Sequence, residues 1–363
     1  MIEALQKAFA QNVADGMEQG GSVSVWQAGQ ELCTLVAGEA RSDVAWQPDT
    51  MVPIFSATKA AAAACLLQAL HDCCRGPELE VGDLWPAFPL PHCTIGQVLS
   101  HQAGLAALAY PAPLDDLEAC RVAIERSTPL WQPPQHGYHP QTFGPIVDIL
   151  MLELTGLRIA DYWETHVRAP LGLEFYIGHV PEKLYPRVAH LRAARMLGSM
   201  PRTPFYRAYF DEHTAVHRAF HSISGFSSPR EMNTPEAWQC GSPAKGGVAS
   251  ARGLAAFYQA LMGYLPQSPF AADVLEWMNT PQCEGYDETL MQHTAFTCGA
   301  MCEPAAFFPH GGFGHAGAGG SHGCCSPQSG VSFAYVMRGM ELGNLPGPRV
   351  DRLLSTLSNG ASH

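Results

Sequence analysis

Strand-like segments stand at both ends of this chain and confine it to a limited set of folds. Residues 22–27 and 31–38 resemble two short strands joined by a turn, and residues 331–337 form the clearest strand near the other end. Residues 71–220 contain mostly helical patches, which proline-rich loops interrupt. Strands at both ends with helices inserted between them predict an α+β fold, with a sheet-containing unit and a helical unit.

The composition describes a folded, acidic protein. The chain has 363 residues, of which 47% are hydrophobic and 15% charged, so it can bury a sizeable core. Its formal net charge of -12 disfavours nucleic acid or an anionic membrane as a partner. The first twenty residues form an amphipathic pattern, with Leu5 and Phe9 on the apolar side, and lack the features of a signal peptide. Without a long apolar window, the predicted location is the cytoplasm and no membrane span is expected.

The twelve cysteines show no paired C-x-x-C spacing, so no zinc site is predicted. In a reducing compartment we expect buried thiols, with redox sensitivity at Cys73-Cys74 or Cys324-Cys325 as the alternative. His213, His217 and His221 recur every four residues, which is a possible metal-ligand spacing. Because charged residues surround these histidines, we interpret them as a solvated helix face. No metal or organic cofactor is predicted.

A serine and a lysine stand three residues apart in Phe55-Ser56-Ala57-Thr58-Lys59, just before an alanine-rich helix predicted at residues 60–70. Residues i and i+3 share one helix face, so the Lys59 amine can reach the Ser56 hydroxyl. Serine becomes a nucleophile when a base takes its proton, and burial can lower the pKa of a lysine enough to make it that base. The alternative interpretation is a helix cap by Ser56 beside a solvated Lys59.

Two later segments favour the catalytic interpretation. One contains Tyr138 in the run HGYHPQTFG, and the other contains His315-Ala316-Gly317 in a glycine-rich frame. The order S-x-x-K, tyrosine and H-x-G resembles the serine β-lactamase and penicillin-binding-protein superfamily, and most closely class C β-lactamases and family VIII carboxylesterases. Further matching segments lie at residues 45–50, 94–105, 169–173 and 330–337, so the resemblance covers roughly residues 20–345.

The resemblance implies a β-lactamase-like architecture. In it, an antiparallel sheet flanked by helices joins an all-helical domain, and the active site lies in the cleft between them. The α/β sandwich domain is expected to combine residues 1–70 and 225–363, and the mainly helical domain to span residues 71–224.

The resemblance also implies catalytic roles. Ser56 is expected to be the nucleophile that carries the acyl group as an ester, with Lys59 and Tyr138 as base and proton relay. Which of the two is the base stays open. We expect the Tyr138 phenol to ionise more easily because Lys59 lies beside it.

A glycine-rich segment is expected to complete the site. His315 replaces the lysine of the K-T-G motif and is expected to orient Tyr138 or contact substrate. Gly317 lets the backbone approach the substrate closely, and the amides of Ser56 and Ala318 are expected to form the oxyanion hole.

The chain departs from the β-lactamase pattern at Pro140, where that family has an asparagine whose amide contacts the substrate. Proline offers neither a side-chain donor nor a backbone N–H, which favours ester over amide substrates. We therefore predict a serine hydrolase acting on small or medium acyl esters. Acyl transfer, amide hydrolysis or weak β-lactam hydrolysis at the same site is the alternative, and a catalytically silent binding protein is the alternative of another class. Oligomeric state is not predicted.

Two short motifs are interpreted as chance matches. Residues 319–323 match the G-x-S-x-G nucleophile elbow, but a turn and a strand follow them where that elbow requires a helix. Residues 312–317 match G-x-G-x-x-G without the strand–helix context of a dinucleotide site.

Overall fold

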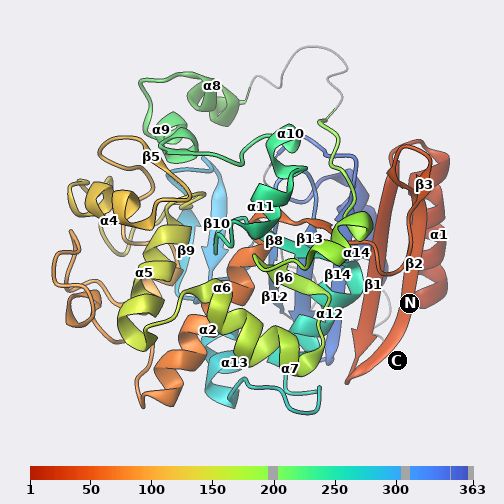
Figure 1. Cartoon of the computed structure of the whole chain (residues 1–363), viewed down its shortest axis with the longest axis horizontal. Coiled ribbons are helices and arrows are strands. Elements are labelled where there is room, and N and C mark those ends of the chain that lie inside the picture. The colour runs from red at the N-terminus through yellow and green to blue at the C-terminus, as the bar shows by residue number, and fades with distance from the viewer. Residues whose placement is uncertain (195–202, 304–310, 344, 359–363) are drawn as a thin grey trace.

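The structure is a computed structural model, which describes residues 1–194, 203–303, 311–343 and 345–358. Within these ranges an antiparallel sheet of nine strands has the order β3-β2-β1-β14-β13-β12-β11-β10-β9 (Figure 1). The first and last strands of the chain are neighbours in this sheet, since β1 pairs with β14 and Val23 lies opposite Tyr335. The strands are β1 Gly20–Gln27, β2 Gln30–Arg41, β3 Val44–Ala45, β9 Cys283–Tyr286, β10 His293–Phe296, β11 Met301–Glu303, β12 Phe313–Ala316, β13 His322–Ser326 and β14 Val331–Met337.

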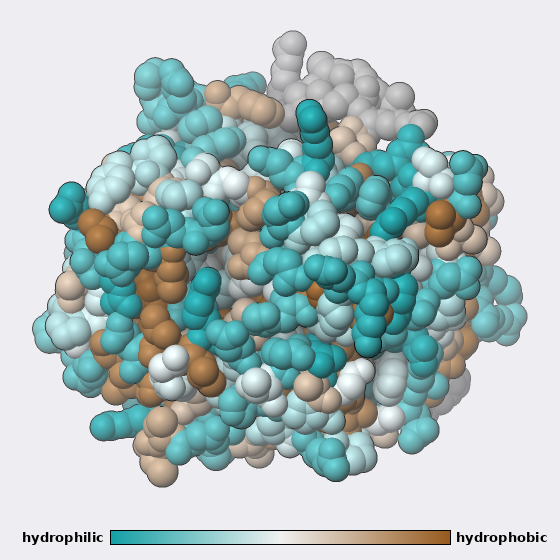
Figure 2. All heavy atoms as spheres, in the orientation of Figure 1, coloured by the Kyte–Doolittle hydropathy of each residue, from teal (hydrophilic) through white to brown (hydrophobic). Residues whose placement is uncertain are grey.

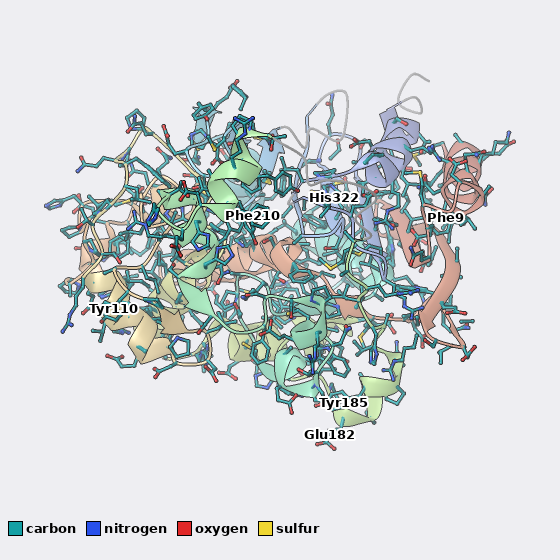
Figure 3. All side chains as sticks on the ribbon, turned by 90° about the horizontal axis from the view of Figure 1, so that it is seen from above. Phe9, Tyr110, Glu182, Tyr185, Phe210 and His322 are labelled. Carbon is teal, nitrogen blue, oxygen red and sulfur yellow. The ribbon has the colours of Figure 1, made fainter. Side chains whose placement is uncertain are left out.

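Helices cover both faces of the sheet because successive strand side chains point to opposite sides. Phe333 and Tyr335 of β14 pack with α1 (Ile2–Ala14) and α14 (Pro348–Ser358). Ala334 and Val336 belong to the core on the other face, where α12 (Ala251–Leu261) packs on β1 and β14. Figure 3 shows α1, marked by Phe9, at one end of the molecule and Tyr110 of the helical part near the other.

The central helix α2 (Lys59–Asp72) is buried along most of its length. Every residue from Lys59 to Leu70 is buried, and five consecutive alanines let its neighbours approach closely. The neighbours are α5, α6, α13 and β12. One approach is so tight that a Cβ placed on Gly299 would lie 2.0 Å from the Ala63 Cβ.

The residues between β3 and β9, which separate the two groups of strands along the chain, are mainly helical. Two smaller sheets join them: β4-β8-β6, and a parallel pair of β5 and β7. Strand β6 lies within residues 71–224, the range predicted for the helical domain, yet it pairs with β8 outside that range. The domain limits of the sequence analysis stay a prediction. The elements are β4 Val52–Pro53, α3 Ile95–Leu99, β5 Ala112–Pro113, α4 Leu117–Glu125, α5 Phe143–Thr155, α6 Ile159–Tyr162, α7 Ala169–Leu171, β6 Phe175–Ile177, α8 Pro204–Phe210, α9 Ala215–His221, β7 Ile223–Ser224, α10 Pro229–Met232, α11 Pro235–Gln239, β8 Gly247–Ala249 and α13 Ala272–Asn279.

The predicted α+β fold with an antiparallel sheet is confirmed. The strand predicted at residues 331–337 has the observed limits, and the helix predicted at residues 60–70 extends to Lys59–Asp72. In the described ranges, no helix is long and apolar enough to cross a membrane. The face in Figure 2 is largely hydrophilic, with hydrophobic side chains gathered over α5. All twelve cysteines lie in the described ranges, and none of them forms a disulfide there.

Candidate active site

Ser56 lies in a single 3-10 turn, Phe55–Thr58, immediately before α2. The turn is anchored by Thr58, whose hydroxyl donates to the Phe55 carbonyl at 2.6 Å and accepts the Gly247 N–H at 2.9 Å. Phe55 has φ +48°, a left-handed conformation that is uncommon for an aromatic residue. Strained backbone of this kind tends to occur at functional sites, and here it directly precedes the predicted nucleophile.

The Lys59 amine is fully buried and has three neighbours. Its Nζ lies 3.0 Å from the Ser56 Oγ, 2.9 Å from the Pro140 carbonyl oxygen and 3.0 Å from the Ala244 carbonyl oxygen. Burial lowers the pKa of Lys59 well below 10.5, and the positive charge of Lys245 lowers it further.

The three contacts of the Lys59 amine fix where its N–H groups and its lone pair point when the amine is neutral. Such an amine has two N–H donors and one lone pair, and carbonyl oxygens can only accept. The two N–H groups therefore go to Pro140 and Ala244, and the lone pair is left facing the Ser56 hydroxyl. This is the arrangement that a base needs in order to take the serine proton.

Tyr138 is buried beside this pair, and its ring lies 5.0 Å from the Lys59 Nζ. It stacks on Phe296 at 6.2 Å and meets the edge of His101 at 4.9 Å. Burial raises the pKa of Tyr138, and a hydrogen bond with Ser56 offsets only part of that rise. The prediction that Lys59 makes the phenol ionise more easily is wrong, because the loss of solvent outweighs a lysine whose own pKa is lowered.

The sequence analysis missed Asp287, which holds the backbone of Tyr138. The Asp287 carboxylate is buried and accepts the Tyr138 N–H at 3.0 Å. It also accepts N–H bonds from Thr289 and Leu290 at 2.8 and 2.7 Å and the Thr294 hydroxyl at 3.1 Å. Apart from its being an aspartate, no sequence signal could have drawn attention to it, since its partner lies 149 positions away.

His315 lies behind the pocket and contributes no lining atom there, as far as the described residues show. Its ring packs 5.9 Å from that of Tyr138, and its Nδ1 pairs with the Ala316 carbonyl at 2.7 Å. Burial lowers the pKa of His315 to about 3, so the imidazole is neutral. His315 therefore packs against Tyr138, and the structure gives it no hydrogen bond to that residue.

Gly317 and Ala318 follow β12 and bring its end against the turn that contains Ser56. A Cβ on Gly317 would lie 2.1 Å from the Ile54 carbonyl oxygen, so only glycine permits this approach. Ala318 lines the pocket together with Ser56. Their amides stay the predicted oxyanion hole.

The serine of the G-x-S-x-G match and the spaced histidines make other contacts in the structure. Ser321 of the G-x-S-x-G match is fully buried and donates to the Ile54 carbonyl at 2.7 Å, so it supports the turn before Ser56. His213 lies outside α9, while the rings of His217 and His221 stack at 4.0 Å. Among the residues described, no cluster of three or more His, Cys, Asp or Glu side chains is arranged to hold a metal.

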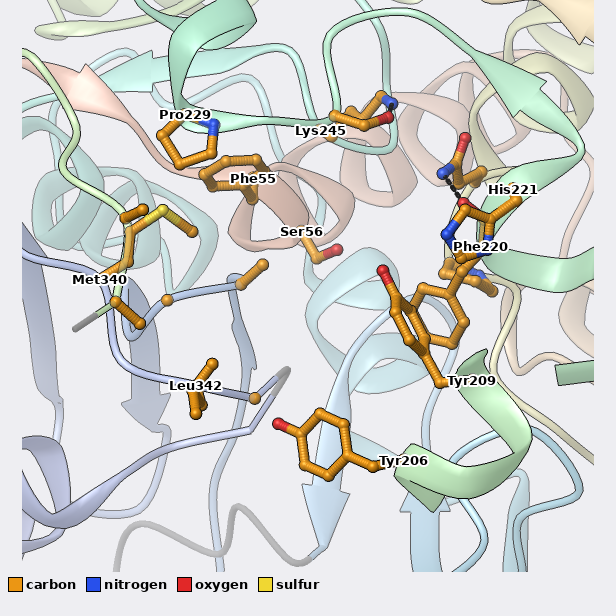
Figure 4. A pocket seen from close by; sticks show the side chains of 18 of the residues that line it. Phe55, Ser56, Tyr206, Tyr209, Phe220, His221, Pro229, Lys245, Met340 and Leu342 are labelled. Carbon is orange, nitrogen blue, oxygen red and sulfur yellow. Dashed lines mark hydrogen bonds between the residues drawn. The ribbon is translucent and has the colours of Figure 1, made fainter. Parts of the chain in front are cut away.

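A pocket of about 660 Å³ opens at Ser56. Figure 4 shows Ser56 at its centre, with the Tyr209 hydroxyl pointing toward it from α8 and Met340 and Leu342 on the opposite side. Most of the wall is apolar or aromatic, with Lys245 and Glu341 as its charged members in the described structure. The other lining residues include Phe55, Tyr138, Pro140, Gln141, Phe205, Tyr206, Phe210, Phe220, His221, Ile223, Pro229, Ala318 and Gly319.

The Beta-lactamase family model matches residues 5–354 of this chain. The esterase/beta-lactamase LipL of Mycobacterium tuberculosis is 28% identical over 355 aligned residues, covering 91% of this chain and 79% of LipL. A penicillin-binding protein homologue from Caulobacter crescentus superimposes with a TM-score of 0.84 at 26% identity, covering 97% of this chain and 95% of that one. A family VIII carboxylesterase superimposes with a TM-score of 0.85 at 25% identity, covering 98% and 96%.

Proposed function

The chain belongs to the Beta-lactamase family and is a serine hydrolase of that fold, and we propose that it is a carboxylesterase that forms its acyl-enzyme on Ser56. The observation that carries this proposal is the Lys59 amine, whose two carbonyl partners leave its lone pair for the Ser56 hydroxyl 3.0 Å away. The esterase names of LipL and the family VIII carboxylesterase support an ester as the substrate.

In the first step, the Lys59 lone pair takes the Ser56 proton while the Ser56 Oγ forms a bond to the ester carbonyl carbon. The resulting oxyanion accepts hydrogen bonds from the amides of Ser56 and Ala318. When the C–O bond to the alcohol breaks, the neutral Tyr138 phenol donates its proton to the leaving oxygen, and the Lys59 ammonium restores that proton. The raised pKa of Tyr138 supports this role as a proton donor.

In the second step, water replaces the alcohol. Lys59, neutral again, takes a proton from the water through Tyr138, and the water oxygen attacks the acyl carbon. The bond to the Ser56 Oγ then breaks, Ser56 regains its proton, and the carboxylic acid leaves.

Weak β-lactam hydrolysis is a second candidate because LipL carries both names. Pro140 counts against it, since this residue lines the pocket and offers only its carbonyl, which Lys59 already uses.

Intact-protein mass after treatment with a fluorophosphonate tests the proposal. We expect one adduct on the parent protein, none on Ser56→Ala and little on Lys59→Met. Ser321→Ala is the matched control, because it removes a buried serine hydroxyl that supports the same turn. If Ser321→Ala is labelled and Ser56→Ala is not, the result supports Ser56 as the nucleophile. An unlabelled, folded parent protein, or equal labelling of Ser56→Ala, would overturn the proposal.

A further inference from the structure

Lys245 is a buried cation without an acidic partner. The chain has four lysines, and Lys245 is one of the two that are buried, at 6% exposure. Its Nζ donates to the Gly225 carbonyl at 2.9 Å and to the Ser227 hydroxyl at 3.2 Å. Among the side chains that the structure describes, no carboxylate lies within ion-pair distance of it. An ammonium group has three donors, so one N–H is left over.

Glu231 is an acidic residue near Lys245, but its carboxylate already accepts hydrogen bonds within its own segment. The Glu231 carboxylate accepts from the backbone of Ser227 and Ser228 and from the Ser228 hydroxyl, which forms the N-terminal cap of α10. A charge removed from water without a counter-ion costs free energy, so a buried ammonium group without a counter-ion gains stability when an anion binds to it.

Lys245 lies on the wall of the same pocket as Ser56 (Figure 4). It is the only lysine or arginine among the described lining residues. Glu341, the acidic residue of the wall, is paired with the buried Arg349, whose Nε lies 3.1 Å from the Glu341 Oε1. The unpaired positive charge of the pocket therefore lies at Lys245, in the same pocket as the proposed nucleophile.

Lys245 is also distinct from the catalytic base. Ala244, the preceding residue, accepts from Lys59 through its carbonyl, while the Lys245 side chain turns to the loop that contains Gly225 and Ser227. Burial lowers the pKa of Lys245 only to about 8, so most of it is charged at neutral pH.

We propose that Lys245 binds a carboxylate of the substrate, so that the preferred esters carry an acidic group in addition to the scissile bond. This inference rests on the proposed esterase function and adds the substrate class. A single unused N–H on a single cation matches one singly charged carboxylate. A phosphate would bring a charge of about -1.5 to -2 and three acceptor oxygens, for which the described wall offers no second cation.

Matched ester pairs test the proposal on the parent enzyme. 4-Nitrophenyl hydrogen adipate and 4-nitrophenyl hexanoate differ by a carboxylate on the acyl part. 4-Acetoxybenzoate and its methyl ester differ by a carboxylate on the alcohol part. In at least one pair, kcat/KM for the acidic ester is expected to exceed that for the neutral ester, mainly through a lower KM.

Lys245→Met is the decisive variant, because methionine keeps much of the side-chain volume and removes the charge. We expect the acidic-to-neutral ratio of kcat/KM to fall about 10- to 100-fold, the range for a hydrogen bond between charged groups. The ratio cancels any change at Lys59, since both esters use the same base. Lys183→Met makes the same charge change at an exposed residue next to Glu182, which Figure 3 shows at the periphery, and is expected to leave the ratio unchanged.

Binding of adipate, measured by calorimetry, tests the same site without turnover. The parent protein is expected to bind adipate, and Lys245→Met to bind it about tenfold or more weakly. Equal ratios for the parent and Lys245→Met in both ester pairs, or a parent that does not bind adipate, would overturn the proposal while leaving the esterase function intact. Failure of all four esters, with adipate bound through Lys245, would instead reject the esterase function and keep the carboxylate site.

Discussion

Asp287 holds the backbone of Tyr138 through both carboxylate oxygens, which lie 3.0 and 3.2 Å from the Tyr138 nitrogen. The two residues are 149 positions apart, so this contact ties the loop before α5 to the turn after β9. Ser56, Lys59 and Tyr138 come from two separate segments, and their mutual placement depends on such a tie.

Asp287→Ala should lower both stability and activity. The variant leaves the N–H groups of Tyr138, Thr289 and Leu290 without their acceptor, and we expect the free energy of unfolding to fall by about 2–4 kcal/mol. Urea unfolding measures the loss, and kcat on a neutral ester should fall with it. Asp287→Asn keeps one acceptor oxygen and should lose less. An Asp287→Ala variant as stable as the parent would contradict the positioning role.

The pH dependence of kcat/KM should reflect Lys59. Only the neutral amine accepts the Ser56 proton, so activity on a neutral ester should rise with pH through a Lys59 pKa well below 10.5. Because burial raises the pKa of Tyr138, the phenol should cause no loss between about pH 8 and pH 10. Lys245→Met removes a nearby positive charge and should shift the acidic limb toward higher pH. An acidic limb that does not move in Lys245→Met would refute the charge coupling between the two lysines.

Tyr138→Phe separates packing from proton transfer. Phenylalanine keeps the ring contacts with Phe296 and His101, so the melting temperature should change little. The lost hydroxyl removes the proposed donor to the leaving alcohol, and kcat should fall about 100-fold or more. Steady-state kinetics with thermal unfolding checks both outcomes. A variant with full kcat would show that Tyr138 has no part in proton transfer.

Pro140→Asn should widen the substrate range toward amides. The Lys59 contact uses the backbone carbonyl of residue 140, which the substitution retains, and the new side-chain amide would stand at the pocket wall. We expect the ratio of β-lactam to ester turnover to rise about tenfold, as for one gained hydrogen bond. Pro140→Ala, which also lacks the amide, is the control. A rise of equal size in both variants would show that the loss of proline, rather than the gain of the amide, is responsible.

The preference for acidic esters should itself depend on pH. Lys245 loses its charge as pH rises through about 8, so the acidic-to-neutral ratio of kcat/KM should fall across that range. Burial is the main cause of the lowered pKa, and Glu231 and Cys240 oppose it. Lys245→Met should show a flat ratio over the same pH range. A parent ratio that is constant from about pH 6 to about pH 10 would contradict a role for the Lys245 charge.

The sequence predicted local features well because they depend on neighbouring residues. The strand-like run of β14 and the alanine run of α2 were sufficient to locate both elements, although β1 and β2 extend beyond the predicted limits. The ionisation of Tyr138 was predicted wrongly because burial is a property of the whole fold. Asp287 and Lys245 were missed for the same reason. Each is a single charged residue in a loop, and its contacts become visible only when distant segments meet.

The burial of α2 from Lys59 to Leu70 separates the residues proposed for the reaction from the pocket walls that would select the substrate. Helix α2 cannot change without disturbing α5, α6 and α13, so Ser56 and Lys59 are held as a constant unit. The opposite walls of the pocket come from α8, α9 and the segment after β14, which have exposed surfaces. New specificities should therefore evolve, or be engineered, by exchanging these wall segments as cassettes around an unchanged catalytic helix.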